Sequence, residues 1–271
     1  MTLLSVTRDV CAAVGVTLPQ SVFSNITGNR TMQEMLSLAN EMAQRIAYDQ
    51  RDWTVLRTTV TYPGDAVWTG VPLSTLPEDQ VWVGGTTAFS LPANFKRMLL
   101  TSNVWRSTSG QPMRFISDPD EWLNRRAINA QDSASGEWTI YGGKIHLWPV
   151  MYGIKPAIPP TTPAVPAVAA YFAYIDKNCV KLSSGGYGDV FMNDADEFRL
   201  DERLLKLAMI YQWKAQKGSS YAEDMSTFGD ALTVAMGHDA PAPILIDRKP
   251  ISAHTKLVAP SHTIYVPGMV P

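Results

Sequence analysis

Apolar residues recur every three or four positions along residues 31–49, which is the spacing of one face of an α-helix. Thr31 and Glu34 have the spacing of a capping box, so we expect this helix to begin at Thr31. The same spacing along residues 3–14 predicts a shorter helix that Gly15 ends. The long apolar stripe consists of Met35, Leu38, Met42 and Ile46.

Beyond the long helix the repeat shortens from about 3.6 to about 2, and the β-branched run 54–61 predicts a strand exposed on one face. A tight hairpin is expected at Gly142 and Gly143, because both positions permit a positive φ. One short helix interrupts the strands, with Asp118 as its cap and Pro119 as its first residue. The other strand-like runs are 81–83, 98–105, 111–116, 137–141, 144–148 and 167–175.

Helical spacing returns after residue 193. Asp194 or Asp196 is placed to cap a helix that is apolar around much of its circumference, and Gly218 is placed to end it. Ser220 and Glu223 then form a second capping box, which predicts a further helix. A helix apolar on so many sides is expected at the centre of a bundle. Its apolar residues are Phe198, Leu204, Leu205, Leu207, Ala208, Ile210 and Tyr211.

These patterns predict an α+β fold. Residues 1–52 and 193–236 are expected to form one helical bundle, into which a mainly antiparallel β-rich domain, residues 53–192, is inserted. A Pro-rich loop, residues 149–166, is expected to protrude from the β domain. Residues 237–271 are expected to form an extended C-terminal arm, because proline favours extended chain and removes ladder donors.

The loop and the arm hold 12 of the 19 prolines, yet both also hold apolar side chains that a linker kept in water does not need. The arm spans roughly 100 Å when extended. We therefore expect both segments to contact a neighbouring subunit or another partner. The candidate contact residues are Ile244, Leu245, Ile246, Leu257, Val258, Ile264, Tyr265 and Val266 in the arm, and Ile154 and Ile158 in the loop.

The composition excludes several classes of protein. Hydrophobic residues make up 45% of the chain and charged residues 18%, which excludes disorder throughout. A formal net charge of −2 disfavours a surface dedicated to gripping nucleic-acid phosphates. The two cysteines, Cys11 and Cys179, are too few for a disulfide framework and favour a reducing compartment. No apolar run approaches the roughly 20 residues that cross a bilayer, so we expect no membrane partner.

No motif predicts catalytic, cofactor-binding or metal-binding residues. The four histidines, at 146, 238, 254 and 262, lack metal-ligand spacing, and no GxSxG motif is present. The glycine-rich run 183–189 lacks the GK[ST] of a phosphate loop, and the acidic run 193–197 lacks the spacing of a calcium loop. Paired carboxylates for glycoside hydrolysis stay open as an alternative, since such pairs can come from any part of a fold. The eight tryptophans keep open a sugar-binding groove.

Several short motifs follow one another in an order that resembles the head-to-tail adaptor proteins of tailed bacteriophages, including the tubular or gatekeeper adaptors of short-tailed phages. The resemblance covers about residues 31–235; the Pro-rich loop and the arm depart from it. The motifs are Leu36-x-Leu38-Ala39-Asn40, Asp52-Trp53-x-x-Leu56, the run Phe-Ser-Leu-Pro-Ala-Asn-Phe-Lys-Arg at 89–97, Pro112, Trp122, and the hairpin at 141–149 that ends in proline.

The resemblance implies a non-enzymatic structural protein of the virion neck, made in the host cytoplasm. It implies a homo-oligomeric ring, usually of twelve copies, with the portal protein above, the tail or nozzle protein below, and DNA passing through without sequence-specific binding. The helical bundle is then expected to face the portal and the β domain the tail. The alternatives are a tail-tube, nozzle or tail-completion protein and, from another class, a carbohydrate-binding or hydrolytic tail protein.

The run 89–97 looks like a signature turn of that group, and we expect it to be structural within one subunit. In this turn Pro92 fixes φ, following Leu91, and Asn94 hydrogen-bonds local backbone. Phe95 is expected to anchor in the β domain, and Arg97 to reach a carboxylate or a backbone carbonyl.

Overall fold

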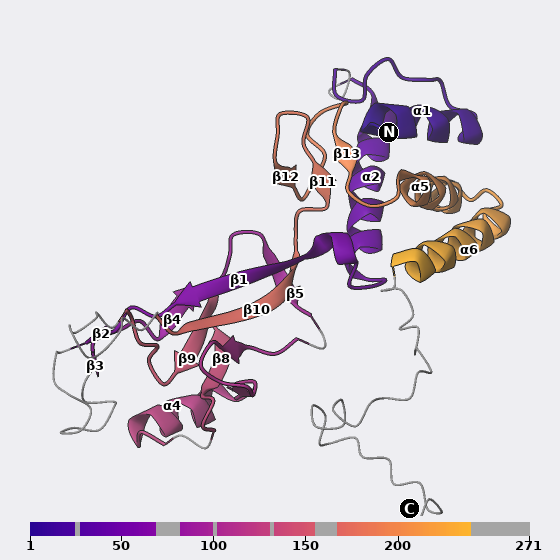
Figure 1. Cartoon of the computed structure of the whole chain (residues 1–271). Coiled ribbons are helices and arrows are strands. Elements are labelled where there is room, and N and C mark those ends of the chain that lie inside the picture. The colour runs from indigo at the N-terminus through magenta and orange to yellow at the C-terminus, as the bar shows by residue number, and fades with distance from the viewer. Residues whose placement is uncertain (25–27, 69–81, 100–101, 131–132, 155–166, 240–271) are drawn as a thin grey trace, which may run out of the picture.

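The structure is a computed structural model that describes residues 1–24, 28–68, 82–99, 102–130, 133–154 and 167–239, and its class is α+β (Figure 1). Most of the predicted Pro-rich loop and nearly all of the predicted arm therefore lie outside the described residues. The contact candidate Ile158 and all eight candidates in the arm, from Ile244 to Val266, are among the residues not described.

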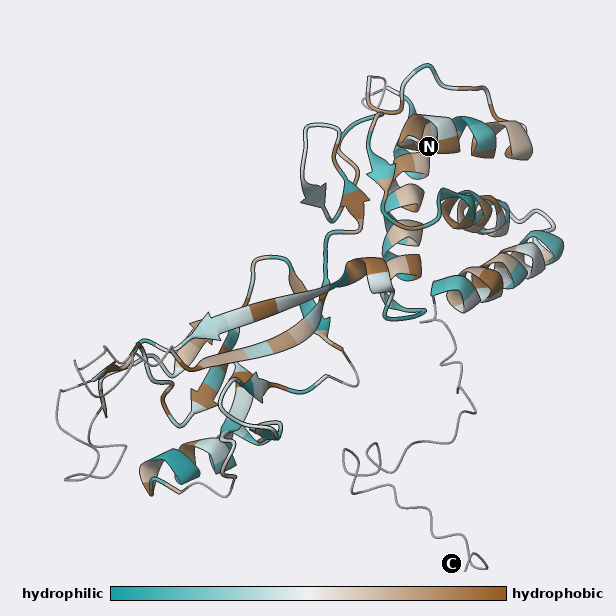
Figure 2. Ribbon diagram, in the orientation of Figure 1, coloured by the Kyte–Doolittle hydropathy of each residue, from teal (hydrophilic) through white to brown (hydrophobic). Residues whose placement is uncertain are grey.

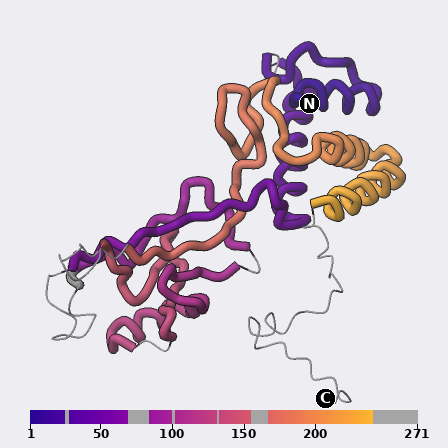
Figure 3. Tube along the Cα trace, in the orientation of Figure 1, coloured from indigo at the N-terminus to yellow at the C-terminus, as the bar shows by residue number. Residues whose placement is uncertain are grey.

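Four helices share one hydrophobic core. They are α1 (Leu3–Val14), α2 (Arg30–Tyr48), α5 (Glu202–Gln216) and α6 (Ala222–Asp239). The first and last described residues thus belong to the same part of the molecule (Figure 3). Apolar positions on α1, α2 and α5 are brown in Figure 2. Core residues from these helices include Val6, Val10, Met35, Leu38, Met42, Ile46, Leu204, Leu205, Ala208, Met209 and Leu232.

The cap of α2 differs from the sequence prediction. The side chain of Asn29 accepts hydrogen bonds from the Thr31 and Met32 N–H groups at 3.1 and 3.3 Å, so the helix begins at Arg30. Glu34 does not complete a capping box; it pairs with Arg30 at 2.8 Å and with Lys217 at 2.6 Å. The prediction was wrong because Asn29 is also a strong capping residue and lies just upstream.

The start of α5 also differs from the prediction. Asp201 caps this helix by accepting from the Arg203 N–H at 2.8 Å, and neither earlier aspartate does so. Asp194 instead accepts from the Val22 N–H at 2.8 Å and from the Ser21 hydroxyl. Phe198, expected in the helix, lies in the short strand β13 (Glu197–Phe198). The acids that precede α5 therefore hold loops together.

Asp196 is the most buried of these acids, with 1% of its surface exposed. Its carboxylate accepts from three N–H groups, those of Ser183 at 2.8 Å and of Met192 and Asn193 at 2.7 Å. Burial raises the pKa of Asp196, but these hydrogen bonds outweigh burial and hold the pKa below its ordinary value near 3.8. The ionised carboxylate thus holds the glycine-rich turn at 183–189 and the loop after it together.

Asp196→Asn is expected to lower the free energy of unfolding by about 2 kcal/mol near neutral pH, because an amide oxygen cannot accept all three bonds. The folded-state pKa is lowered, so the ionised group stabilises the fold at pH above about 4 and loses that effect as the pH falls through the folded pKa. Urea unfolding of both proteins across pH should show a difference that shrinks below pH 4. Asp201→Asn is the control, since asparagine caps helices equally well; an equal loss in both variants would contradict this role.

The β part contains two four-stranded sheets and a second core. One sheet has the order β1-β10-β5, with β6 also on β10. Its strands are β1 (Arg57–Pro63), β10 (Ala169–Asp176), β5 (Phe95–Met98) and β6 (Trp105–Arg106). The other has the order β4-β9-β8-β7. Its strands are β4 (Ala88–Ser90), β9 (Lys144–Trp148), β8 (Glu137–Tyr141) and β7 (Arg114–Phe115).

Smaller elements complete the structure. The helix α4 (Pro119–Ala127) has Asp118 as its cap, as predicted. The hairpin of β8 and β9 is also confirmed, with Gly142 and Gly143 both at positive φ. The remaining elements are the 3₁₀ turn η1 (Thr54–Leu56) and the strands β2 (Val67–Trp68), β3 (Trp82–Val83), β11 (Val180–Lys181) and β12 (Tyr187–Gly188).

A long antiparallel ribbon connects the two cores. The strands β1 and β10 pair from Arg57 with Ile175 to Pro63 with Ala169. At one end Leu56 and Ile175 are buried among the helices, and further along Tyr62, Phe172 and Tyr174 are buried in the core of the β part. Figure 1 shows the ribbon running from the helices into the β part. The strand β10 therefore contributes to both hydrophobic cores, and β1 links its own core residue Tyr62 to Leu56 of the turn η1 just before it.

Two strand predictions need correction. The run 54–61 begins with the turn η1, because the buried Trp53 donates its indole N–H to the Ile46 carbonyl at 2.7 Å and bends the chain there. The run 98–105 is not one strand. It changes surroundings along its length, since Leu99 packs on the helical core and Val104 is buried in the β core.

Candidate functional site

The turn predicted from residues 91–97 lies where the helices meet the β part. The Pro92 carbonyl accepts from the Phe95 N–H at 2.9 Å, which closes the turn. The Phe95 ring lies 5.6 Å from the Tyr174 ring and 6.3 Å from the Phe172 ring, between ring centroids, and Leu91 packs on the same core. The turn is therefore anchored in the β part of its own chain.

Asn94 fastens this turn to β10 in a way that differs from the sequence prediction. Its amide oxygen accepts from the Tyr174 hydroxyl at 2.9 Å, and not from local backbone. Its backbone carbonyl accepts from the Lys177 N–H at 2.8 Å. Sequence reasoning placed the partner nearby because Asn commonly bonds within its own turn, whereas the fold brings Tyr174 within reach from 80 positions away.

Arg97 ties β5 to the end of α2. One guanidinium nitrogen, Nη2, lies 2.5 Å from the Asp52 carboxylate and 3.4 Å from the Tyr48 carbonyl oxygen, so both predicted kinds of partner are present. The Lys96 ammonium lies 4.6 Å from the centre of the Tyr48 ring. The Tyr48 hydroxyl donates to the Lys177 carbonyl, and burial raises the pKa of Tyr48, so this hydroxyl stays a donor. We call the contacts of Asn94, Lys96 and Arg97 with the end of α2 and with β10 the joint.

Tyr174→Phe is expected to cost about 1 kcal/mol of unfolding free energy, because it removes one hydrogen bond from the buried side of the joint. Tyr171→Phe on the same strand is the matched control, since Tyr171 is 41% exposed and Tyr174 only 4%. Urea unfolding measures both. Equal stabilities for the two variants would show that the bond between Tyr174 and Asn94 contributes nothing.

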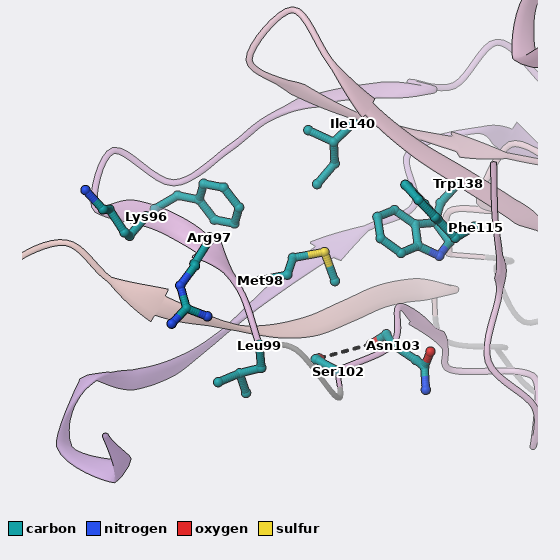
Figure 4. A pocket seen from close by; sticks show the side chains of 10 residues that line it. Lys96, Arg97, Met98, Leu99, Ser102, Asn103, Phe115, Trp138 and Ile140 are labelled. Atoms are coloured by element: carbon teal, nitrogen blue, oxygen red, sulfur yellow. Dashed lines mark hydrogen bonds between the residues drawn. The ribbon is translucent and has the colours of Figure 1, made fainter. Parts of the chain in front are cut away.

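A cleft of about 520 Å³ opens beside the joint, between β5 of one sheet and β7 and β8 of the other (Figure 4). Its lining is largely apolar, with Lys96 and Arg97 on one wall. Sequence reasoning missed this cleft, because its walls come from strands far apart in the chain. The lining residues are Phe95, Lys96, Arg97, Met98, Leu99, Ser102, Asn103, Phe115, Trp138 and Ile140.

A buried ion cluster supports the wall of this cleft from behind. Glu137 of β8 has a fully buried side chain, and its two oxygens contact Arg125 at 3.2 Å and Arg126 at 2.7 Å. The Arg126 guanidinium also lies 4.7 Å from the Trp122 ring and 4.5 Å from the Trp148 ring. These contacts fix α4 on the sheet next to Trp138, which follows Glu137 and lines the cleft.

Some of the exposed apolar side chains lie at opposite ends of the described residues, and others, such as Phe115 and Tyr171, lie between them. Val67 and Ile154 are 68% and 70% exposed, close to the tip formed by β2 and β3. Tyr221 and Met225, at the start of α6, are 43% and 54% exposed at the other end (Figure 1). The structure thus separates the contact candidate Ile154 from the signature turn.

The described residues offer little reactive chemistry. Within them no three His, Cys, Asp or Glu side chains are grouped so that they could hold a metal ion. Cys179 is buried in the helical core, and burial raises the pKa of its thiol. Of the helices in the described ranges, none is both long enough and apolar enough to span a membrane.

Comparison with known proteins does not place the chain in a family. No family model matches the sequence, and no curated protein matches it. The joint, the cleft and the exposed ends are therefore interpreted from their own geometry.

Proposed function

We propose that this protein is a head-to-tail adaptor of a tailed bacteriophage, a structural component of the virion neck. In this proposal residues 1–52 and 193–236 form a helical bundle that meets the portal, and the inserted residues 53–192 form a β domain that meets the tail. The extended C-terminal arm contacts neighbouring copies. Copies of the chain form a twelve-fold ring through which DNA passes.

The observation that carries the proposal is a pair of distinct hydrophobic cores, one helical and one in the β part, joined by the β1–β10 ribbon. A subunit between two partner rings needs a contact surface at each end. Exposed apolar side chains occur at both ends here, Val67 and Ile154 at the β tip and Met225 on α6. Exposed apolar groups on a folded chain favour contacts with other proteins. The serial order of the motifs, from the long helix to the hairpin 141–149, supports the same assignment.

The joint gives the proposed subunit its stiffness. Arg97, Asp52 and Asn94 fasten the turn 91–97 to both the helices and β10. A stiff connection suits a component that must hold two partner rings in register. The net charge of −2 suits a ring that lets DNA slide without gripping its phosphates.

The mass of the native oligomer tests the proposal. The purified full-length chain is expected to be a twelve-fold ring, or a monomer that becomes one only on portal rings. Native mass spectrometry of the protein alone and after mixing with portal rings measures both states. A stable trimer would contradict the adaptor and favour a fibre or spike, including the carbohydrate-binding or hydrolytic alternative. A ring that binds only tail proteins would favour the tail-tube or nozzle alternative.

A further inference from the structure

The cleft beside the joint has an apolar floor and an open mouth. Met98 of β5 points into its centre, with Ile140 on one side and the rings of Phe115 and Trp138 on another (Figure 4). The Phe115 side chain is 53% exposed, although its ring packs 4.6 Å from that of Trp138. An aromatic and aliphatic recess of this kind is stabilised by an apolar occupant that takes its surface out of water.

Arg97, which lines the cleft, has one guanidinium nitrogen without an acceptor in the described part of the chain. Nη1 of Arg97 is buried and has no hydrogen-bond partner among the described residues, whereas Nη2 contacts Asp52 and Tyr48. A buried N–H without an acceptor costs roughly 1–3 kcal/mol. The occupant that fits this cleft therefore combines apolar side chains with an adjacent carbonyl or carboxylate oxygen.

The described chain ends next to this wall. Asp239, the last residue of α6, accepts from the Thr54 N–H at 3.1 Å and lies 3.4 Å from Arg51. Asp52, between those two residues, holds Arg97 of the cleft. Position 244 is five residues past Asp239, a distance of about 17 Å when the chain is extended. The next apolar run in the sequence thus lies within reach of the cleft.

We propose that the run Ile244, Leu245 and Ile246 occupies this cleft in its own chain. Its side chains cover Met98 and Ile140, and the adjoining backbone carbonyls or the Asp247 carboxylate accept from Arg97. The run is the first in the arm with three consecutive apolar residues, and an acid follows it directly. The proposal divides the arm into a first part that is anchored on its own chain and a distal part that stays available for partners. Docking of the run 244–246 does not depend on whether the protein forms a ring.

Chemical cross-linking in the full-length protein tests the proposal. Asn103→Cys places a thiol on the cleft wall, and Arg248→Cys places one just after the apolar run. The natural Cys11 and Cys179 are buried and stay unreactive. With a short bis-maleimide, we expect this pair to link within one chain about tenfold faster than the control pair. The expected gain reflects the high effective concentration of a docked segment.

The control pair combines Arg248→Cys with Thr108→Cys, an exposed position on the β part that does not line the cleft. Equal rates for the two pairs would overturn the proposal. Links formed only between chains, seen as doubled mass under denaturing conditions, would also overturn it and assign the cleft to a neighbouring copy. Since the linked mass is read on denatured chains, the result is independent of whether the native protein forms a ring.

A second substitution separates docking from simple proximity. Leu245→Asp in the cleft-wall pair is expected to lower the linking rate to that of the control pair, because a charged side chain cannot enter the apolar floor. Ile264→Asp, in the distal part of the arm, is the matched change and is expected to leave the rate unaltered. Loss of the fast linking in both variants, or in neither, would contradict docking of the run 244–246.

Discussion

A chain that ends at Asp239 is expected to fold normally and to fail to assemble at the neck. Its folding should survive because the residues that form both described cores lie between positions 3 and 232. Its assembly should fail because the deleted residues 240–271 contain the distal apolar runs, from Leu257 to Val266, that we assign to partner contacts. Native mass spectrometry of mixtures with portal rings measures assembly, and thermal unfolding measures folding. Normal assembly of the truncated chain would contradict the proposed role of the arm.

Substitutions in the full-length chain distinguish the contribution of the apolar side chains to assembly from that of the arm's length. Serine at Leu257, Val258, Ile264, Tyr265 and Val266 is expected to reproduce the loss of assembly, because it removes the apolar surface that the contact buries. Alanine at the intervening polar positions Ser261, His262 and Thr263 is the control and is expected to assemble normally. Failure of both sets alike would show that the contact depends on something other than the apolar side chains.

Glu137→Gln is expected to lower the free energy of unfolding by about 3 kcal/mol, since it leaves two arginines facing a neutral group in a buried site. Glu137 is completely buried, and Arg125 and Arg126 keep their charges when it is replaced. Urea unfolding gives the loss directly. The loss should change little with added salt, because a buried pair is poorly screened.

Glu197→Gln provides the comparison on the surface. Glu197 pairs with Lys181 at 2.9 Å, and the two side chains are 39% and 61% exposed, whereas Glu137 is fully buried. Exposed pairs contribute little to stability, so this variant is expected to unfold at the same urea concentration as the natural protein. Similar losses of unfolding free energy for both variants would show that the buried cluster of Glu137, Arg125 and Arg126 stabilises the fold no more than an exposed ion pair.

Local signals in the sequence predicted the local elements of this fold well. The pair Gly142 and Gly143 located the hairpin, because few other residues adopt two successive positive φ angles. Asp118 and Pro119 located α4 for an equally local reason. The cap of α2 was misplaced by two positions because Asn29 and Thr31 are both good capping residues. Propensity alone does not choose between two such neighbours.

Long-range contacts could not be predicted in the same way. The sequence indicated that Arg97 needs an acidic or carbonyl partner, but not that Asp52 supplies it from 45 positions away. Nothing near Glu137 in the sequence distinguished it from a surface acid, because its burial depends on how α4 packs against β8. The cleft depended on how two separate sheets pack, because β5 belongs to one and β7 and β8 to the other. Such features follow from tertiary packing and not from periodicity.

The ribbon of β1 and β10 has a consequence for cooperativity. Its strand β10 contributes Ile175 to one core and Phe172 to the other, and Leu56 of η1, directly before β1, is buried in the first. Melting of the helices would therefore release one end of the ribbon and weaken the sheet that depends on it. We expect the described parts to unfold together in a single calorimetric transition, with equal calorimetric and van't Hoff enthalpies. Two resolved heat-absorption peaks would instead reveal parts that melt independently.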